Sequence, residues 1–518
     1  MAIKRYWAAK DNTITNAFME NLTTRGTGSN MGASDILEVF SIFGQAASSS
    51  AEASRALLKF NCTASTNSIK ADRDNGKIPV SGSVSFYLRM FNAPHGQTLP
   101  KSYTMDITAV SGTWDEGTGL DMEGYKDKGS SNWVNRHGTT AWATHAGAAN
   151  QGGVYHSDIS SSFSASFDGG TEDIELDITT LVEQWVNSAG NVLGSKGDEG
   201  VGVFISNTYG AASRSYYTKK FFGRGSEYFY KRPYIEARWN SATKDERGSF
   251  NYSSSLADST ENMNTLYFYN YFKGRLRNIP GIGTGKIYVS FFSGNVPDEK
   301  PFGNPLTLVV DQTSVSDAAR NTVVTGGYVS TGVYTASVAL TASLTPLETV
   351  YDVWFSGGYG MSDPPPGSTQ YHTGAIYPVK LSGYDYAPST EYATSISNLK
   401  DMYRENENAR FRTYVREKDW NPTIYTKARS QPVSLTIESG SYEVYRVIDD
   451  YKVIPFGTGS DGQTQMAFDM SGNYFDLDMG LFEPGYMYGI KFAYYNADVA
   501  AWVQQPETFK FRVKSGQN

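Results

Sequence analysis

The sequence predicts an all-β protein that consists of several β-sandwich domains in tandem. Three observations support this fold class. Charged residues make up only 19% of the 518 residues, whereas aromatic residues make up 14%, with 36 Tyr and 51 Gly. Short apolar segments alternate with polar residues, which is the period of a strand with one buried face. The chain is also longer than one ordinary domain, and long amphipathic helical patterns are few.

The first 35 residues are an unusual lead-in, because the basic and aromatic Lys4–Trp7 precede a polar, glycine-rich run. Such a segment is ordered only where it lies against something else. Two interpretations stay open: a strand and loop packed onto its own domain, or an arm that crosses to a neighbouring subunit. We designate residues 1–35 an N-terminal arm, with Tyr6, Trp7 and Arg25 as its predicted interface residues.

A first domain is predicted at residues 36–240, around the segment 171–207. Ile174, Leu176 and Ile178 alternate with polar residues, and the spacing then becomes helical over Thr179–Val186. Thr179 or Thr180 could cap this helix, with Glu183 as the back-reaching residue of a capping box if Thr180 is the cap. Other predicted strands of the domain are Asp35–Phe43, Ser54–Phe60, Val84–Phe91, Tyr103–Val110, Gly200–Ile205 and Arg232–Trp239.

Residues 111–170 of this domain are long and irregular, and loops of this length are usually functional or packed on a partner. They contain the aromatic residues Tyr125, Trp133, Trp142 and Tyr155. These rings could form a platform that stacks on sugar rings, since flat apolar faces complement the CH-rich faces of sugars. The alternative, which the residue types favour, is packing in a core or an interface.

The second half of the chain predicts two further sandwiches. Residues 241–264 are polar and Ser-rich and are predicted to form a linker. An Ig-like sandwich is expected at 265–372, because short strands recur there at sandwich spacing. A C-terminal sandwich is expected at 373–518, and within it Asn398–Glu407 is the one plausible helix. Jelly-roll and Ig-like variants of the sandwich are both compatible with these patterns.

Composition and charge exclude several classes of protein. The net charge of −8 argues against a general nucleic-acid binder, because phosphate contacts need a basic face. Cys62 is the single cysteine, so an intramolecular disulfide is excluded. The first residues lack an apolar core of signal-peptide length, and no run of about 18 apolar residues predicts a membrane span.

No motif in the sequence predicts catalysis, a metal or a cofactor. His137, His145 and His156 match no established ligand spacing, so packed or surface histidines are the better interpretation. Asp115-Glu116 and Glu172-Asp173 could supply a carboxylate pair for glycoside hydrolysis, but acidic turns produce such pairs by chance. We therefore expect a protein that is not an enzyme and binds no cofactor.

Several segments of the first domain resemble one family. DIELDITTLVEQWV followed by GVGVFI is similar to a strand–helix–strand segment of the secreted β-sandwich domains called DNRLRE domains. SVSFYLRMFN, MDITAVSGTWDEGTG, AWATHAGA and YFYKRPYIEARW resemble further elements of that family, in its order. The resemblance covers roughly residues 80–240 and implies a β-sandwich. Some domains of the family bind polysaccharide, which keeps a glycan among the candidate ligands.

The chain as a whole resembles virion structural proteins of tailed bacteriophages. The Gly/Ser/Thr/Tyr-rich composition, the near absence of Cys, and stretches such as MAIKRYWAAKDNTITNAF and GNYFDLDM are similar to those proteins. The resemblance implies a non-enzymatic protein of the head, neck, tail or baseplate, assembled in the host cytoplasm. Its partners would be other virion proteins in a homo- or hetero-oligomer, without nucleic acid or membrane. The alternative is a carbohydrate-binding adhesion module that contacts a host surface.

Overall fold

The computed structural model describes most of the chain, and it separates into two compact units. The N-terminal unit consists of Ala2–Asn240 with Gly457–Gln463, and the C-terminal unit of Ser241–Phe456 with Thr464–Asn518. The described residues are 2–44, 46–48, 50–96, 99–120, 129–142, 152–187, 196–210, 212, 214–254, 257–258, 261–295, 300–309, 320–341, 346–357, 368–379, 391–418, 434–457, 461–497 and 499–516.

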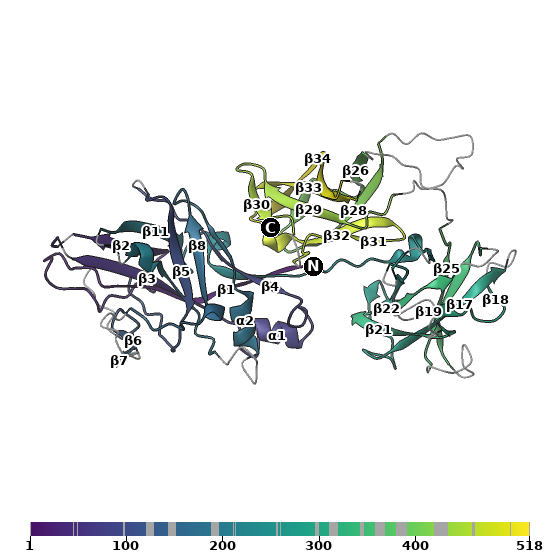
Figure 1. Ribbon diagram of the computed structural model, residues 1–518, viewed down its shortest axis with the longest axis horizontal. Coiled ribbons are helices and arrows are strands. Elements are labelled where there is room, and N and C mark those ends of the chain that lie inside the picture. The colour runs from purple at the N-terminus through teal and green to yellow at the C-terminus, as the bar shows by residue number, and fades with distance from the viewer. Residues whose placement is uncertain are drawn as a thin grey trace. The chain divides into compact units, whose positions relative to one another are not determined.

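The N-terminal unit is a β-sandwich with two short helices at one end (Figure 1). Its main sheet runs β8-β5-β10-β3-β1-β12-β4-β9, and β2 joins β3 to β11. The elements are β1 Ile3–Thr15, β2 Ile36–Phe43, β3 Ala51–Phe60, α1 Ile69–Asp74, β4 Ser85–Met90, β5 Tyr103–Ala109, β6 Asn135–His137, β7 Thr140–Ala141, η2 Ile159–Ser161, β8 Ser162–Phe167, β9 Ile174–Asp177, α2 Thr179–Val186, β10 Val201–Ile205, α3 Asn207–Gly210, β11 Tyr216–Phe222, η3 Phe229–Lys231 and β12 Tyr234–Arg238.

Strand β1 connects the two layers of this sandwich. Its first half pairs with β12 from Ile3 to Trp7, and its second half pairs with β3 from Ala8 to Thr15, with a register shift after Ala8. A bulge bends a strand and lets it pass from one sheet to the other. Of the two interpretations of residues 1–35, a strand packed onto its own domain therefore describes β1, whose side chains contribute to the core of its own unit.

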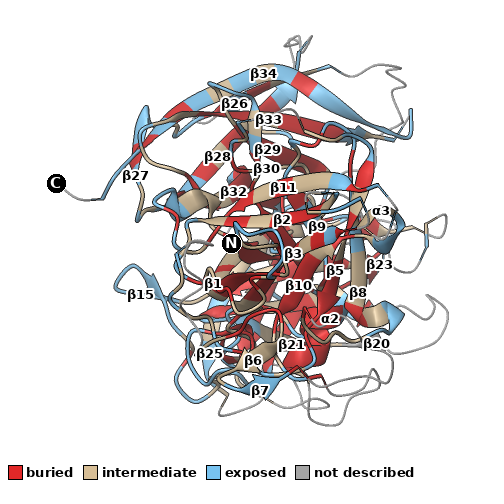
Figure 2. Cartoon of the chain, turned by 90° about the vertical axis from the view of Figure 1, so that its left-hand side faces the viewer, coloured by how far each residue is buried: buried red, intermediate tan, exposed pale blue. Residues whose placement is uncertain are grey.

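The core of the N-terminal unit lies between these layers and is continuous with α2 (Figure 2). Trp185, Leu181 and Val182 of α2 are fully buried in it, beside Phe86 of β4 and Val203 of β10. The predicted strand–helix–strand segment is thus present. The predicted cap is wrong: Ile178 is the N-cap, and the Asp177 carboxylate accepts from the Thr179 backbone N–H at 2.8 Å. Glu183 instead binds Arg73 through two hydrogen bonds.

The C-terminal unit contains two sets of sheets (Figure 1). One sheet runs β14-β22-β21-β17-β24-β25, and two others run β26-β28-β32-β31 and β27-β34-β33-β29-β30. The elements are η4 Glu246–Gly248, β13 Tyr252–Ser253, β14 Asn264–Tyr269, β15 Tyr271–Phe272, β16 Arg275–Leu276, β17 Ile287–Asn295, β18 Lys300–Phe302, β19 Leu308–Val309, β20 Arg320–Asn321, β21 Val324–Ser330, β22 Val333–Val338, β23 Leu340–Thr341, β24 Val350–Phe355, β25 Gln370–Ile376, β26 Tyr392–Ile396, β27 Met402–Arg404, β28 Asn408–Glu417, β29 Gly440–Arg446, β30 Tyr451–Ile454, β31 Ala467–Asp469, β32 Gly472–Asp478, η5 Met479–Leu481, β33 Met487–Asn496 and β34 Ala501–Lys514.

Two predicted boundaries are displaced in this unit. The predicted linker 241–264 contains β13, which pairs with β23, and the buried Phe250, which belongs to the hydrophobic core formed with β14, β17 and β24. The predicted boundary between 372 and 373 falls inside β25, which pairs with β24 as far as Ile376. The polar composition of residues 241–264 therefore did not reveal that part of this segment packs into the core.

The helix predicted over Asn398–Glu407 is absent, because Met402–Arg404 forms β27 and pairs in parallel with β34. Tyr403 is buried between two exposed neighbours, and its ring contacts those of Phe411 and Phe511 at 5.3 and 5.6 Å. Alternation with period two, anchored by one aromatic residue, is the pattern of a strand. The chain is nevertheless all-β and multi-domain, as its sequence predicts.

Candidate binding cleft

Two of the three predicted interface residues are occupied within the N-terminal unit. Tyr6 is buried, and its hydroxyl donates to the Asp72 carboxylate at 2.9 Å. Burial beside Asp72 raises the pKa of Tyr6 well above its usual value. The Trp7 ring packs against Phe229 and Tyr234, with centroid distances of 4.4 and 4.8 Å. Both side chains therefore stabilise their own sandwich, because β1 is part of its sheet.

Arg25, the third predicted interface residue, lies at the edge of a cleft. Its Nη1 donates to the carbonyl oxygens of Asn16 and Ala51 at 2.8 and 2.9 Å. Its guanidinium also lies 4.2 Å from the centroid of the Phe18 ring, within the range of a cation–π contact. These contacts fix the loop that follows β1 onto β3.

The predicted aromatic platform is not formed, since its tryptophans are core residues. Trp133 and Trp142 are only 6% and 2% exposed and pack in one cluster with Trp114. The Trp142 indole N–H donates to the Asn132 carbonyl oxygen at 2.9 Å. Stacking on a sugar needs an open ring face, which neither side chain offers. Tyr155 is partly buried against the same cluster, and Tyr125 lies outside the described residues.

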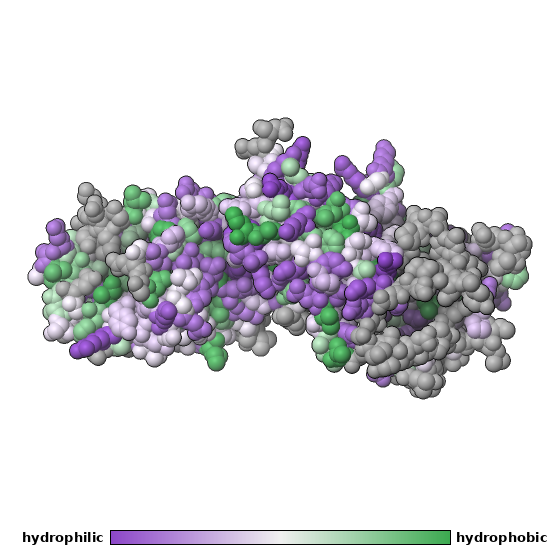
Figure 3. Space-filling model, turned by 90° about the horizontal axis from the view of Figure 1, so that it is seen from above, coloured by the Kyte–Doolittle hydropathy of each residue, from purple (hydrophilic) through white to green (hydrophobic). Residues whose placement is uncertain are grey.

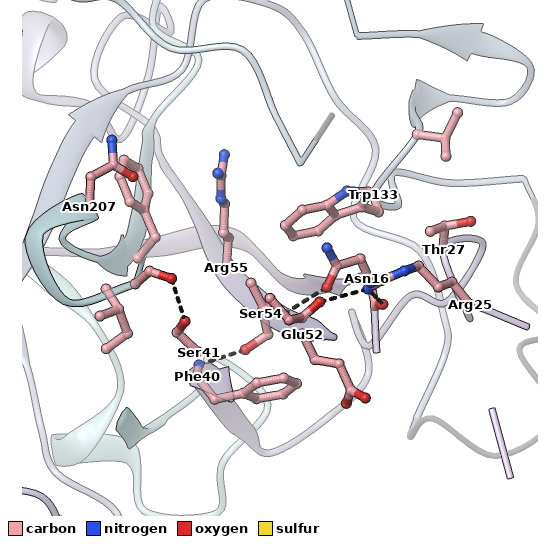
Figure 4. A pocket seen from close by; sticks show the side chains of 16 residues that line it. Asn16, Arg25, Thr27, Phe40, Ser41, Glu52, Ser54, Arg55, Trp133 and Asn207 are labelled. Atoms are coloured by element: carbon pink, nitrogen blue, oxygen red, sulfur yellow. Dashed lines mark hydrogen bonds between the residues drawn. The ribbon is translucent and has the colours of Figure 1, made fainter. Parts of the chain in front are cut away.

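The cleft has a volume of about 690 Å³ and is lined by residues of β2, β3 and β10 (Figure 4). Asn16 and Arg25 line it on one side, and Asn207 at the start of α3 lines it on the other. Ser41 closes its base, where its hydroxyl donates to the Gly210 carbonyl oxygen at 3.0 Å. This size is within the range of small-ligand sites, and the polar lining indicates a polar ligand.

Arg55 and Glu52 of β3 also line the cleft with their charged side chains, and no sequence motif singles out either residue. The Arg55 guanidinium lies near three rings, at 5.2 Å from Trp133, 5.5 Å from Tyr155 and 4.9 Å from Phe204. Its Nη1 donates to the Gly152 carbonyl oxygen at 2.8 Å. Polar and apolar residues alternate along β3, and this spacing places Arg55 on the strand face that points away from the core. The alternation is therefore the sequence pattern that indicates the position of Arg55.

Glu52 contributes a buried carboxylate to the floor of the cleft. It is 3% exposed, and its Oε1 has no hydrogen-bond partner among the described residues. Burial raises the pKa of Glu52, and the charge of Arg25 opposes this shift only in part. A buried oxygen without a partner carries a desolvation cost, which a hydroxyl or ammonium group of a ligand would relieve.

The acidic pairs considered for catalysis have structural partners instead. The Glu116 carboxylate accepts two hydrogen bonds from Arg224, both at 2.9 Å. The Asp173 carboxylate accepts from the Asn92 backbone N–H at 2.8 Å. Asp115 is exposed. The hydrogen bonds of Glu116 and Asp173 therefore position loops on strands.

The described residues contain no group of three or more His, Cys, Asp or Glu side chains that could hold a metal ion. His137 and His156 are described, whereas His145 lies outside the described residues. Burial lowers the pKa of His156, as expected of a packed histidine. Within the described part of the chain, none of the helices has the length and apolar character that a membrane crossing requires.

Comparison with known proteins adds no assignment to this site. No family model matches the chain, and no curated protein matches it, so the resemblance to DNRLRE domains stays a prediction. Solved structures that align with it include fibronectin(III)-like modules of CbhA from Clostridium thermocellum, at 9% identity and a TM-score of 0.14, over 54% of this chain and 93% of that one.

Two further solved structures align at similar levels. They are the native alpha-2-macroglobulin of E. coli, at 7% identity and a TM-score of 0.15 over 83% of this chain and 20% of that one, and a DUF4785 family protein from Legionella pneumophila, at 7% identity and a TM-score of 0.12 over 93% and 90%. Scores of this size carry no argument about function.

Proposed function

We propose that the protein is a non-enzymatic virion structural protein of a tailed phage, and that it docks on other virion proteins. The observation that supports this proposal is the hairpin β15–β16 in the C-terminal unit, which presents aromatic and basic side chains to solvent. Figure 2 shows it as a projecting segment coloured as exposed. On the face drawn in Figure 3, hydrophilic residues predominate and hydrophobic ones form small separate groups.

The hairpin has a tight turn, and its aromatic residues are exposed. Lys273 and Gly274 connect the two strands with φ of 50° and 74°, the left-handed conformation that a two-residue type I′ turn requires. Tyr271 and Phe272 are 59% and 52% exposed. Large exposed aromatic residues on a fixed scaffold are typical of binding hot spots, because little conformational entropy is lost when they are covered.

Charge indicates what kind of partner would cover the hairpin. No Asp or Glu occurs from Asn262 to Pro297, whereas Lys273, Arg275, Arg277 and Lys286 lie in that stretch of a chain with net charge −8. The Arg277 guanidinium lies 5.4 Å from the centroid of the Phe272 ring. A protein surface with carboxylates around an apolar recess would complement both properties. Nucleic acid is a poorer fit, because the rest of the chain repels phosphate.

The test uses particles assembled without this chain, to which the purified full-length protein is added before sedimentation. We expect the unmodified protein to sediment with the particles, and Arg275→Glu with Arg277→Glu to reduce its binding at least tenfold. The turn residues stay unchanged, so the hairpin geometry is kept. Lys101→Glu is the matched control, because Lys101 is an exposed cation in the N-terminal unit.

Failure of the unmodified protein to sediment would reject the virion role. Binding of the double variant that equals that of the control would reject the hairpin as the docking element. Deleting residues 1–30 is a weaker experiment, because it removes β1 from the middle of its sheet.

A second candidate function is carbohydrate binding, which the cleft of the N-terminal unit favours. Arg55, Asn207 and the unpartnered Glu52 oxygen offer both donors and acceptors, as sugar hydroxyls require. Asn207 is exposed, so Asn207→Ala tests the cleft with little risk to folding. We expect binding on a glycan array that this variant loses. No binding by the unmodified chain, or unchanged binding by the variant, would reject this function.

A further inference from the structure

Lys219 in β11 is fully buried, which is rare for a lysine. Its Nζ donates to three oxygens: Asn92 Oδ1 at 2.8 Å, the Gly170 carbonyl at 2.9 Å and the Glu172 carbonyl at 2.7 Å. The rings of Phe167 and Phe221 lie 4.8 and 5.3 Å from Nζ. The amine is therefore held in one position in a largely apolar environment.

The side-chain amide of Asn92 lies directly at this amine. Since the Nζ–Oδ1 distance is 2.8 Å and a C=O bond is about 1.2 Å long, the Asn92 Cγ lies within about 4 Å of Nζ. The Asn92 backbone is fixed as well, because its N–H donates to Asp173 and the residue forms a β-bridge with Phe221. The nucleophile and the carbonyl carbon are thus close to the separation of reacting atoms.

The environment also makes the neutral amine more accessible than in an ordinary lysine. Burial lowers the pKa of Lys219 to about 8, although Glu172 and Asp173 oppose this shift. A desolvated lysine with a lowered pKa is an activated nucleophile. Glu172 Oε2 is buried and has no hydrogen-bond partner among the described residues, and its charge acts on both Lys219 and Tyr103. Burial alone would raise the pKa of Glu172, but backbone N–H groups, including those of Gly169 and Gly170, and the charge of Lys219 lower it, so the ionised carboxylate is available to accept a proton.

We propose that Lys219 and Asn92 form an intramolecular isopeptide bond. The neutral Nζ attacks Cγ of Asn92, the new Nζ–Cγ bond forms, and the Cγ–Nδ2 bond breaks. The Glu172 carboxyl takes a proton from Nζ and delivers it to Nδ2, which leaves as ammonia. No oxidant, metal or cofactor is needed, and the product is one secondary amide and one ammonia.

Such a bond would close the sandwich covalently between β11 and Asn92, two residues after the end of β4. It would join positions 127 residues apart in the sequence. A chain with a single cysteine cannot obtain this closure from a disulfide. The alternative is that Lys219 is only a hydrogen-bonded structural lysine, whose three acceptors compensate for its burial.

Intact-mass spectrometry of the denatured full-length protein separates these alternatives. We expect the folded and then denatured chain to be lighter than its sequence by one ammonia, and Lys219→Arg and Asn92→Ala to have the full sequence mass. Proteolytic mapping is expected to give a branched peptide that joins Lys219 to Asn92. A full-mass unmodified chain after prolonged incubation at pH 8 would overturn the proposal.

Two controls distinguish the bond from other events. Asn75-Gly76 can lose ammonia by forming a succinimide. Hydroxylamine cleaves a succinimide, and a succinimide gives no branched peptide. If the loss of ammonia maps to Asn75 instead of Asn92, the proposal is overturned. Glu172→Gln keeps a side-chain oxygen that can accept from the backbone N–H of Gly169, so it leaves this turn intact. We expect this variant to fold and to form the bond at least tenfold more slowly. An unchanged rate would remove Glu172 from the mechanism.

Discussion

Two buried carboxylates, one in each unit, respond to burial in opposite ways. Glu236 in β12 of the N-terminal unit is 1% exposed, and its pKa is lowered to about 2. Asp245 before η4 of the C-terminal unit is 4% exposed, and its pKa is raised to about 6. The extent of burial is nearly the same, so the difference must come from the neighbouring groups.

Glu236 lies between two guanidinium groups. Arg5 Nε donates to its Oε2 at 2.8 Å, and Arg238 Nε donates to its Oε1 at 2.9 Å. Burial alone would raise the pKa, but Arg5, Arg238 and Arg89 outweigh this effect. The network extends to Glu175, which binds Arg238 at 2.6 Å. Side chains point to alternate faces along each strand. The register of β1, β12, β4 and β9 therefore places these charged side chains on one face of the sheet.

Asp245 receives backbone donors but has no comparable side-chain cation. The Arg247 N–H donates to its Oδ1 at 3.2 Å, whereas the Arg247 guanidinium binds the Asp352 carboxylate in a bidentate pair. Burial therefore dominates, and it raises the pKa of Asp245. The comparison teaches that a buried carboxylate stabilises this fold only where a cation is directed at it, which burial does not reveal.

Removal of the better-paired carboxylate should have the largest effect. Glu236→Ala leaves two buried guanidinium groups without this partner, and we expect a loss of about 3–5 kcal/mol in the free energy of unfolding. Hydrogen exchange of peptides that cover β12 and β4 measures this loss of unfolding free energy, and peptides of the C-terminal unit serve as the internal reference. A loss below about 1 kcal/mol would mean that solvent reaches the network.

The two carboxylates should also give opposite slopes of stability against pH. The folded-state pKa of Glu236 is below the unfolded value of 4.5, so its contribution of about 3 kcal/mol is complete above pH 4.5 and is lost as the pH falls towards 2. The folded-state pKa of Asp245 is above 3.8, so the C-terminal unit loses stability as the pH rises from 3.8 to 6. Calorimetry across this range, with transitions assigned by Glu236→Gln and Asp245→Asn, checks both signs.

Asp245→Asn sharpens the comparison by removing the charge and keeping the shape. The amide oxygen can still accept from the Arg247 N–H, whereas the cost of ionising a buried group disappears. We expect the C-terminal unit to become more stable by about 2 kcal/mol at pH 7 and to be unchanged at pH 3.5. Equal effects at both pH values would show that packing, and not charge, distinguishes the variant.

The fold class could be predicted from the sequence because alternation and aromatic content are local properties. Segment 174–205 is the clearest case, since its change of period marks a strand, a helix and a strand. The sequence could not decide between the two interpretations of residues 1–35, because Tyr6 and Arg5 of β1 find their partners in Asp72 and Glu236, far along the chain. The period-two spacing of Tyr217, Lys219 and Phe221 in β11 places these residues on one face of the strand, so this spacing is the sequence signal for a buried lysine.

The smallest expected effect concerns the start of α2, where the sequence and the structure identify different capping residues. The Asp177 carboxylate accepts from the Thr179 N–H at 2.8 Å and from its hydroxyl at 2.6 Å, whereas the Thr180 hydroxyl donates to the Ser160 carbonyl oxygen at 3.2 Å. Asp177→Ala should therefore cost about 1 kcal/mol, and Thr180→Ala clearly less. Hydrogen exchange of the α2 amides measures both. A larger loss for Thr180→Ala would restore the capping box that the sequence predicts.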